Sequence, residues 1–120
     1  MESPQHSNYQ KLLALVPNLF ELKEHVTLKA SGFMDLHVDV LGDETGARRI
    51  ALSHYYKQNG DMVPDPDMEL LVNADKQTVV AQSFQTAMIY QRARSTELDH
   101  FLSQWLNNLK AQGHTASLPG

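Results

Sequence analysis

The feature that most constrains the fold is a two-residue alternation of apolar and polar side chains through the middle of the chain. It covers residues 26–30, 34–40, 50–56, 68–72 and 79–84. Successive side chains of a β-strand point to opposite faces of its sheet, so each segment predicts a strand with one buried face. A chain with this pattern needs a second layer to cover the apolar face.

Short turn-forming segments separate the predicted strands. Residues 42–46 read Gly-Asp-Glu-Thr-Gly and residues 73–76 read Asn-Ala-Asp-Lys. Both are rich in residues that favour tight turns. Because short turns join neighbouring strands in antiparallel pairs, the sequence predicts an antiparallel β-meander of about four to five strands.

Apolar residues take a helical spacing near both ends of the chain. The C-terminal stripe extends from Leu98 to Leu109, and a helix with this pattern packs its apolar side on a sheet. Near the N-terminus, Ser7 and Gln10 have the spacing of a capping box, and Pro17 is expected to end the helix. The fold class expected from these patterns is α+β, with the N- and C-terminal helices packed on one face of the sheet.

The expected domain organisation is a single α+β domain over residues 1–120. Its ends, residues 1–6 and 114–120, are polar and predict flexible tails. Residues 86–94 fit neither a strand nor a helix pattern well, and they receive no assignment.

Composition excludes several function classes. The formal charge of −4 disfavours a nucleic-acid partner, because binding to phosphates needs a basic face. With no cysteine, the chain has neither disulfides nor a thiolate nucleophile. It shows neither a signal-peptide pattern nor an apolar run of membrane-spanning length, so we expect a cytoplasmic protein with no membrane partner.

An acidic stretch in residues 55–72 is the first candidate for chemistry. It contains Asp61, Asp65, Asp67 and Glu69, but it lacks the glycine and glutamate positions of a calcium-binding EF-hand loop. Two prolines, at positions 64 and 66, also keep the backbone extended. We therefore interpret residues 59–67 as a turn and a rigid connection into the next strand.

A second candidate is the polar face formed by Asp35, His37 and Asp39. Their two-residue spacing places all three on one side of a strand. A facial-triad iron site would need a further ligand such as His54 or His100, and neither is placed to join them. A solvated polar face is the better interpretation, and we expect no metal and no cofactor.

Two further groups of residues have structural interpretations. His54 lies on the apolar side of its predicted strand and is expected to be a core histidine bonded to a backbone carbonyl or a tyrosine hydroxyl. The remaining group is basic, and on a net acidic protein it is expected to be scattered surface charge. It comprises Arg48, Arg49, Lys57, Arg92 and Arg94.

Three segments, taken in order, resemble a known family. They are NYQKLLALVPNL at residues 8–19, PDPDMELLVNADKQTVVAQSFQ at residues 64–85 and LDHFLSQWLNNLKAQGH at residues 98–114. The order is similar to that of a short bacterial family called domain of unknown function 1249, although residues 86–95 depart from its pattern. The resemblance implies a bacterial origin and supports the fold, and it brings no catalytic residues.

The function expected from the sequence is non-enzymatic binding of a partner protein or of a second copy as a homodimer. The expected contact residues are Asp61, Asp65 and Asp67 of the acidic stretch, together with the Asp35, His37 and Asp39 face. One alternative is a metal-dependent or acid–base enzyme that uses His37, Asp39 and the acidic stretch. A second alternative is an inhibitor or accessory factor carried on a mobile genetic element. A small-molecule ligand is left open.

Overall fold

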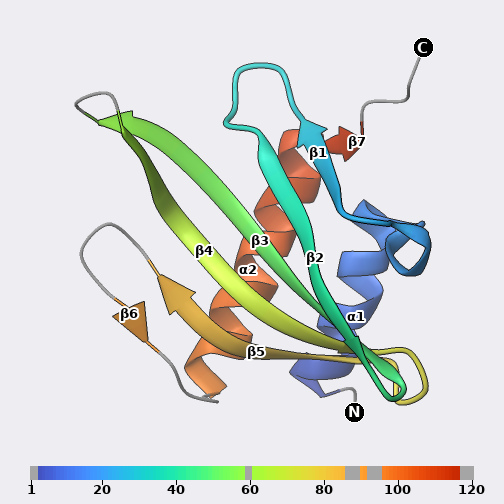
Figure 1. The fold of residues 1–120 in the computed structure, drawn as a ribbon. Helices are drawn as coiled ribbons and strands as arrows, with labels where there is room; N and C mark the ends of the chain where they lie inside the picture. Colours follow the sequence, from blue (N-terminus) through green and yellow to red (C-terminus); the bar gives the residue numbers. More distant parts are fainter. Residues whose placement is uncertain (1–2, 59–60, 86–89, 92–95, 117–120) are drawn as a thin grey trace.

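A single antiparallel sheet forms the centre of the molecule (Figure 1). The computed structural model describes the backbone of residues 3–58, 61–85, 90–91 and 96–116. Side chains are described for the same residues, apart from 56–58, 61–65, 90, 91, 96 and 116. The strand order is β6-β5-β4-β3-β2-β1-β7. The strands are β1 (His25–Lys29), β2 (Leu36–Glu44), β3 (Ala47–Gln58), β4 (Asp61–Asn73), β5 (Thr78–Gln85), β6 (Tyr90–Gln91) and β7 (Thr115–Ala116).

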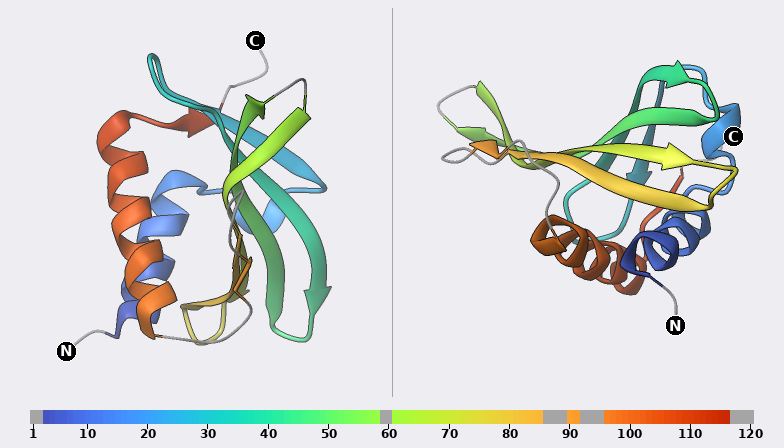
Figure 2. Two further views of the ribbon diagram at one scale, coloured as in Figure 1. Left: turned by 90° about the vertical axis from the view of Figure 1, so that its left-hand side faces the viewer. Right: turned by 90° about the horizontal axis from the view of Figure 1, so that it is seen from below.

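Two helices cover one face of this sheet and leave the other face open (Figure 2). They are α1 (Pro4–Leu15) and α2 (Thr96–Gln112), and a short 3-10 turn, η1 (Leu19–Glu21), follows α1. The predicted α+β class, with an antiparallel meander and both helices on one face, is confirmed. Among the described residues, no helix is long and apolar enough to cross a membrane.

The core lies between the helices and the inward side chains of β1 to β5. The alternation predicted from the sequence is confirmed there, because most of the inward strand residues are buried and the others, such as Val26 and Phe84, are partly buried. The helix side chains in the core include Leu12, Leu102, Leu106 and Leu109, and the strand side chains include Leu28, Val38, Leu52, Met68, Leu70 and Val79.

Helix α1 begins earlier than the sequence pattern predicted. Ser3 caps it by accepting a hydrogen bond from the backbone N–H of His6 at 3.2 Å, and Pro4 occupies the first turn. Proline suits that position because its missing N–H would have no partner inside the helix. The predicted capping box at Ser7 and Gln10 is therefore wrong, and so is a loose tail as far as residue 6.

The hairpin between β2 and β3 is tighter than predicted. Strand β2 continues to Glu44, and the turn closes at Gly46, which has a φ of +73° that glycine adopts without steric cost. After a register shift between Val40 and Gly42, three residues of the predicted turn are paired with β3: Gly42, Asp43 and Glu44. A five-residue turn over residues 42–46 is therefore wrong.

The proline-containing part of the acidic stretch belongs to a strand. Strand β4 already begins at Asp61, and Pro64 pairs with Tyr55 of β3. The register shifts by one residue between this pair and the next pair, Ser53 with Asp67. Pairing with β5 ends at Asp67, so the prolines lie where β4 has a neighbour on one side only, as strand prolines require. The interpretation of residues 59–67 as a loop is wrong for residues 61–67.

The segment after α2 also packs on the fold, where the sequence predicted a flexible tail. Helix α2 ends at Gly113, whose φ is +87°, and the next residue, His114, is buried. Its Nε2 lies 2.8 Å from the backbone oxygen of Met34. Strand β7 then pairs with β1, so the prediction of a tail from residue 114 is wrong for residues 114–116.

Candidate binding hollow on the open sheet face

Polar side chains form two rows across the open face, the sheet face that the helices leave uncovered. Within a row, each residue is the direct cross-strand partner of the next. The first row is His25, Asp39, Ala51, Glu69 and Ser83, and the second is Thr27, His37, Ser53, Asp67 and Gln85. Each row takes one residue from each of β1 to β5, so one row joins residues that are up to 58 positions apart in the chain.

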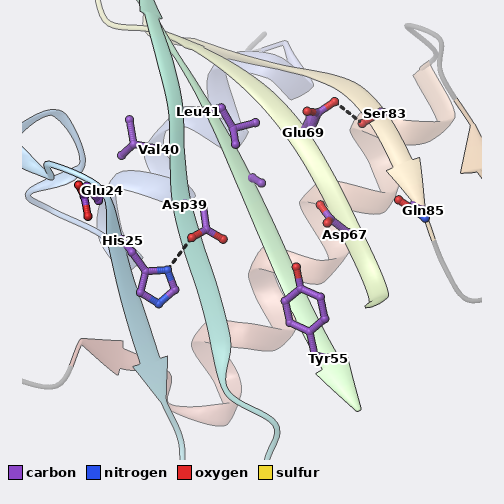
Figure 3. Close-up of a pocket in the computed structure, with 11 residues that line it drawn as sticks. Glu24, His25, Asp39, Val40, Leu41, Tyr55, Asp67, Glu69, Ser83 and Gln85 are labelled. Atoms are coloured by element: carbon purple, nitrogen blue, oxygen red, sulfur yellow. Dashed lines mark hydrogen bonds and ion pairs between the residues drawn. The ribbon is translucent and has the colours of Figure 1, made fainter. Parts of the chain in front are cut away.

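The centre of these rows is a hollow of about 700 Å³ (Figure 3). The central strand, β3, supplies the small side chains Ala51 and Ser53, so the floor is low. The neighbouring strands carry longer side chains, which form the two walls. The hollow is lined by Glu24, His25, Asp39, Val40, Leu41, Ala51, Tyr55, Asp67, Glu69, Ser83 and Gln85.

The lining of this hollow is acidic. Four carboxylates line it, from Glu24, Asp39, Asp67 and Glu69, and no lysine or arginine lines it among the described side chains. Burial raises the pKa of the Asp67 carboxyl above its ordinary value, and the nearby charges of Glu69 and then Asp39 raise that pKa further. The carboxylates of the hollow therefore repel one another, and this repulsion disfavours the ionised form of Asp67.

One wall is organised by histidines. The Nδ1 of His25 lies 2.6 Å from an oxygen of Asp39, and its Nε2 lies 2.9 Å from the hydroxyl of Thr27. The ring of His37 stacks on that of His25, with centroids 5.6 Å apart, and its other neighbour is Tyr55 at 5.5 Å. These contacts hold the Asp39 carboxylate and the Tyr55 ring at fixed places on the open face.

The opposite wall has one internal hydrogen bond. The Ser83 hydroxyl donates to Glu69 Oε2 at 3.1 Å, which fixes that carboxylate across β4 and β5 (Figure 3). No described residue donates a hydrogen bond to the Asp67 carboxylate. Asp67 is thus a half-buried carboxylate with like charges around it and without a donor of its own.

Ser53 is the second unsatisfied group in this region. Its side chain is 0% exposed, and its Oγ has no hydrogen-bond partner among the described residues. Three residues that line the hollow surround its position: Ala51 and Tyr55 along β3, and Asp67 opposite on β4. Buried hydroxyl groups are nearly always paired, so this one marks a place where a donor or acceptor is missing.

Comparison with known proteins identifies the family. A family model described as a domain of unknown function, DUF6908, matches residues 7–115. The chain belongs to the DUF6908 family. No curated protein and no solved structure matches it. The expectation of an uncharacterised family is confirmed, whereas the number 1249 is not confirmed by this match. The DUF6908 match spans every residue of the hollow, and its description assigns no activity.

The structure separates the contact residues predicted from the sequence of this DUF6908 chain. Asp39 and Asp67 both line the hollow, and His37 stands beside it. Asp35 precedes β2 and lies elsewhere, 3.7 Å from Lys29. Asp35 therefore does not line the hollow, and its predicted role as a contact residue beside His37 and Asp39 stays a prediction.

The side chains of Asp61 and Asp65 lie outside the described residues, so their role in partner binding stays a prediction. Within the described part of the chain, no group of three or more histidine, aspartate or glutamate residues could hold a metal ion. The rejection of a metal site also stays a prediction, because these two acids were among the proposed ligands.

His54 has the structural role expected of it. It is buried beneath the sheet, its Nδ1 lies 2.8 Å from the backbone oxygen of Asp35, and its ring meets Trp105 edge-on at 5.4 Å. Arg48 differs from the expected scattered surface charge. Its guanidinium donates to Asp43 and to the backbone oxygens of Leu19 and Leu22, so it joins the first hairpin to η1.

Sequence reasoning missed His25, Ala51, Ser53 and Ser83. The alternation of His25 and Thr27 with apolar neighbours was visible, and it could have marked a polar face on the first strand. What the alternation does not give is the register, which decides which polar residues of different strands meet. The low floor at Ala51 becomes visible only when the neighbouring strands are in place.

Proposed function

We propose that this DUF6908 chain is a non-enzymatic binding protein that holds a positively charged segment of a partner protein in the hollow on its open sheet face. The observation that carries the proposal is the lining: four carboxylates and no described lysine or arginine around one concave surface. A cation placed there removes the repulsion that raises the pKa of Asp67.

Physical magnitudes support a cationic partner over a neutral one. A unit charge about 4 Å from a carboxylate gains roughly 4 kcal/mol at an effective dielectric constant of about 20. Hydrogen bonds between charged groups are about twice as strong as neutral ones. Among the described residues, nothing donates to the Asp67 carboxylate or to the second oxygens of Asp39 and Glu69, so these atoms can accept such bonds without breaking existing ones.

The acidic hollow disfavours a homodimer that forms through the hollow itself. In a two-fold symmetric dimer the same surface meets itself, so contact through the hollow would bring like carboxylates together. A homodimer therefore needs another surface, and light scattering at high protein concentration tests whether one forms. The bacterial origin, the cytoplasmic location and the mobile-element role also stay predictions.

Titration of a labelled basic peptide, read by fluorescence anisotropy, tests the proposed function. The hollow variant is Asp67→Asn with Glu69→Gln, and its matched control is Glu21→Gln with Glu97→Gln, which makes the same change in net charge at exposed positions away from the hollow. We expect at least a tenfold loss of affinity for the hollow variant and less than a twofold loss for the control. Equal losses would show that only net charge matters and would contradict the proposal.

A further inference from the structure

We propose that the occupant of the hollow is the side chain of a single arginine, presented by an extended segment of the partner. This inference rests on the proposed function and specifies its ligand. It is argued from the width of the hollow, the placement of its acceptors, and the aromatic ring at its end.

The width of the hollow favours one side chain over a helix. Asp39 and Glu69 both pair with Ala51, one from each neighbouring strand, so their backbones are two strand spacings apart. Two spacings amount to about 9.5 Å. An α-helix with its side chains is about 10–12 Å across, so it does not fit between these walls, whereas a single extended side chain does.

The acceptors lie on both walls of the hollow, and this favours a guanidinium group. Asp39 uses one oxygen for His25 and keeps its other oxygen on the β2 wall. On the β4 wall, Asp67 has no described donor and Glu69 uses only Oε2 for Ser83. A guanidinium carries N–H donors along several edges of one plane and can donate to both walls at once. A lysine ammonium is a compact point charge, so it would interact with the carboxylates of one wall at a time.

One end of the hollow supplies the remaining contact. Ser53, whose fully buried Oγ has no hydrogen-bond partner among the described residues, lies between Ala51 and Tyr55 on β3 and opposite Asp67, but it does not itself line the hollow. The Tyr55 ring lines the hollow and is held in place by His37. Aromatic rings stack on guanidinium planes, so Tyr55 offers a platform for the arginine head group.

Isothermal titration calorimetry with three blocked pentapeptides tests this inference. The peptides share the sequence Gly-Ser-Xaa-Ser-Gly, in which Xaa is arginine, lysine or citrulline, the neutral analogue of arginine. We expect the arginine peptide to bind at least fivefold more tightly than the lysine peptide, and the citrulline peptide to show no measurable binding. Equal affinity for arginine and lysine would overturn the arginine proposal and leave the cationic proposal standing. Binding of the citrulline peptide, or of none of the three, would overturn both.

A variant that fills the hollow gives a second test that does not alter charge. In Ala51→Leu the larger side chain occupies the floor between Asp39 and Glu69, and we expect at least a tenfold loss of arginine-peptide affinity. Unchanged affinity in a folded Ala51→Leu protein would overturn the placement of the ligand. If Ala51→Leu fails to fold, Tyr55→Leu serves instead, because it removes the ring on which the guanidinium would stack. We expect at least a threefold loss of arginine-peptide affinity, and unchanged affinity would overturn the placement of the ligand.

Discussion

The two faces of the central sheet have opposite character, although the same strands form both. The covered face presents fully buried side chains such as Leu52 and Leu70 to the helices. One residue to either side along the strands, the open face presents carboxylates that repel one another and a buried hydroxyl with no described partner. The contrast indicates that the covered face supplies the stability of the fold, whereas the open face costs stability, as expected of a binding surface under the proposed function.

The largest expected effect comes from the covered face. Leu102 of α2 is completely buried, and Leu102→Ala should lower the free energy of unfolding by about 3 kcal/mol, because truncation leaves a cavity. Leu41→Ala is the matched substitution on the open face, where the side chain is 46% exposed, and should change stability by less than about 0.5 kcal/mol. Urea unfolding of both variants measures the difference. Similar losses would remove the distinction between the faces.

The next largest effect is a loss of peptide affinity, with little change in the free energy of unfolding. Ala51→Leu should weaken binding of a basic peptide by at least tenfold, about 1.4 kcal/mol, because it fills the floor of the hollow. Since the added atoms point away from the core, its urea midpoint should stay close to that of the wild type. A large drop in that midpoint would place Ala51 in the packing that supports the fold.

Substitutions of two serines on the open face should have smaller effects on the free energy of unfolding, and the two effects should have opposite signs. Ser53→Ala removes a buried hydroxyl with no described partner and should raise the free energy of unfolding by up to about 1 kcal/mol. Ser83→Ala is its control, because that hydroxyl donates to Glu69, and it should lower the free energy of unfolding by about 1 kcal/mol or less. A loss of stability in Ser53→Ala would show that its hydroxyl is satisfied in solution.

The smallest expected effect depends on pH. The folded pKa of Asp67 is raised, so the folded state holds this proton to a higher pH than the unfolded chain does. The stability from that proton is complete below the ordinary pKa of 3.8 and is lost as pH rises through the folded pKa. After allowance for solvent screening, Asp67→Asn should stabilise the protein at pH 7 by roughly 0.5 kcal/mol, about 2 °C in Tm.

The pH dependence supplies the control for that substitution. The gain from Asp67→Asn should disappear below about pH 3, well under the ordinary pKa of 3.8, where the wild-type carboxyl is mostly protonated in both states. Thermal melts of the two proteins across this range measure it. A gain that persists at low pH would trace the effect to packing instead of charge.

The part of the fold predicted from the sequence is the part that alternation and helical spacing specify. The inward positions of Met68, Leu70 and Val72, and the outward position of Glu69, follow from a two-residue period alone. The ends of elements were less predictable, because they depend on single caps such as Ser3 and on pairing partners, as for Pro64 in β4.

The candidate site was predicted only in part for a related physical reason. Asp39 was recognised as an acid on a strand face and Asp67 as an acid in the connection before a strand, but the hollow between them depends on the small size of Ala51 on the strand that separates them. Its other contributors depend on pairing as well: His25 meets Asp39 through the β1–β2 register, and Ser83 meets Glu69 next to a register shift between β4 and β5. Sequence periodicity assigns each residue to a face, and the register assigns its neighbours.

The most direct test of the division between the two faces is a map of where a basic peptide binds. Two-dimensional amide NMR of labelled protein during a peptide titration reports each backbone position separately. The account predicts that the largest shifts fall on β2, β3 and β4 around Asp39, Ala51 and Asp67, with little change along α1 and α2. Shifts centred on the helices, or spread evenly over the surface, would contradict it.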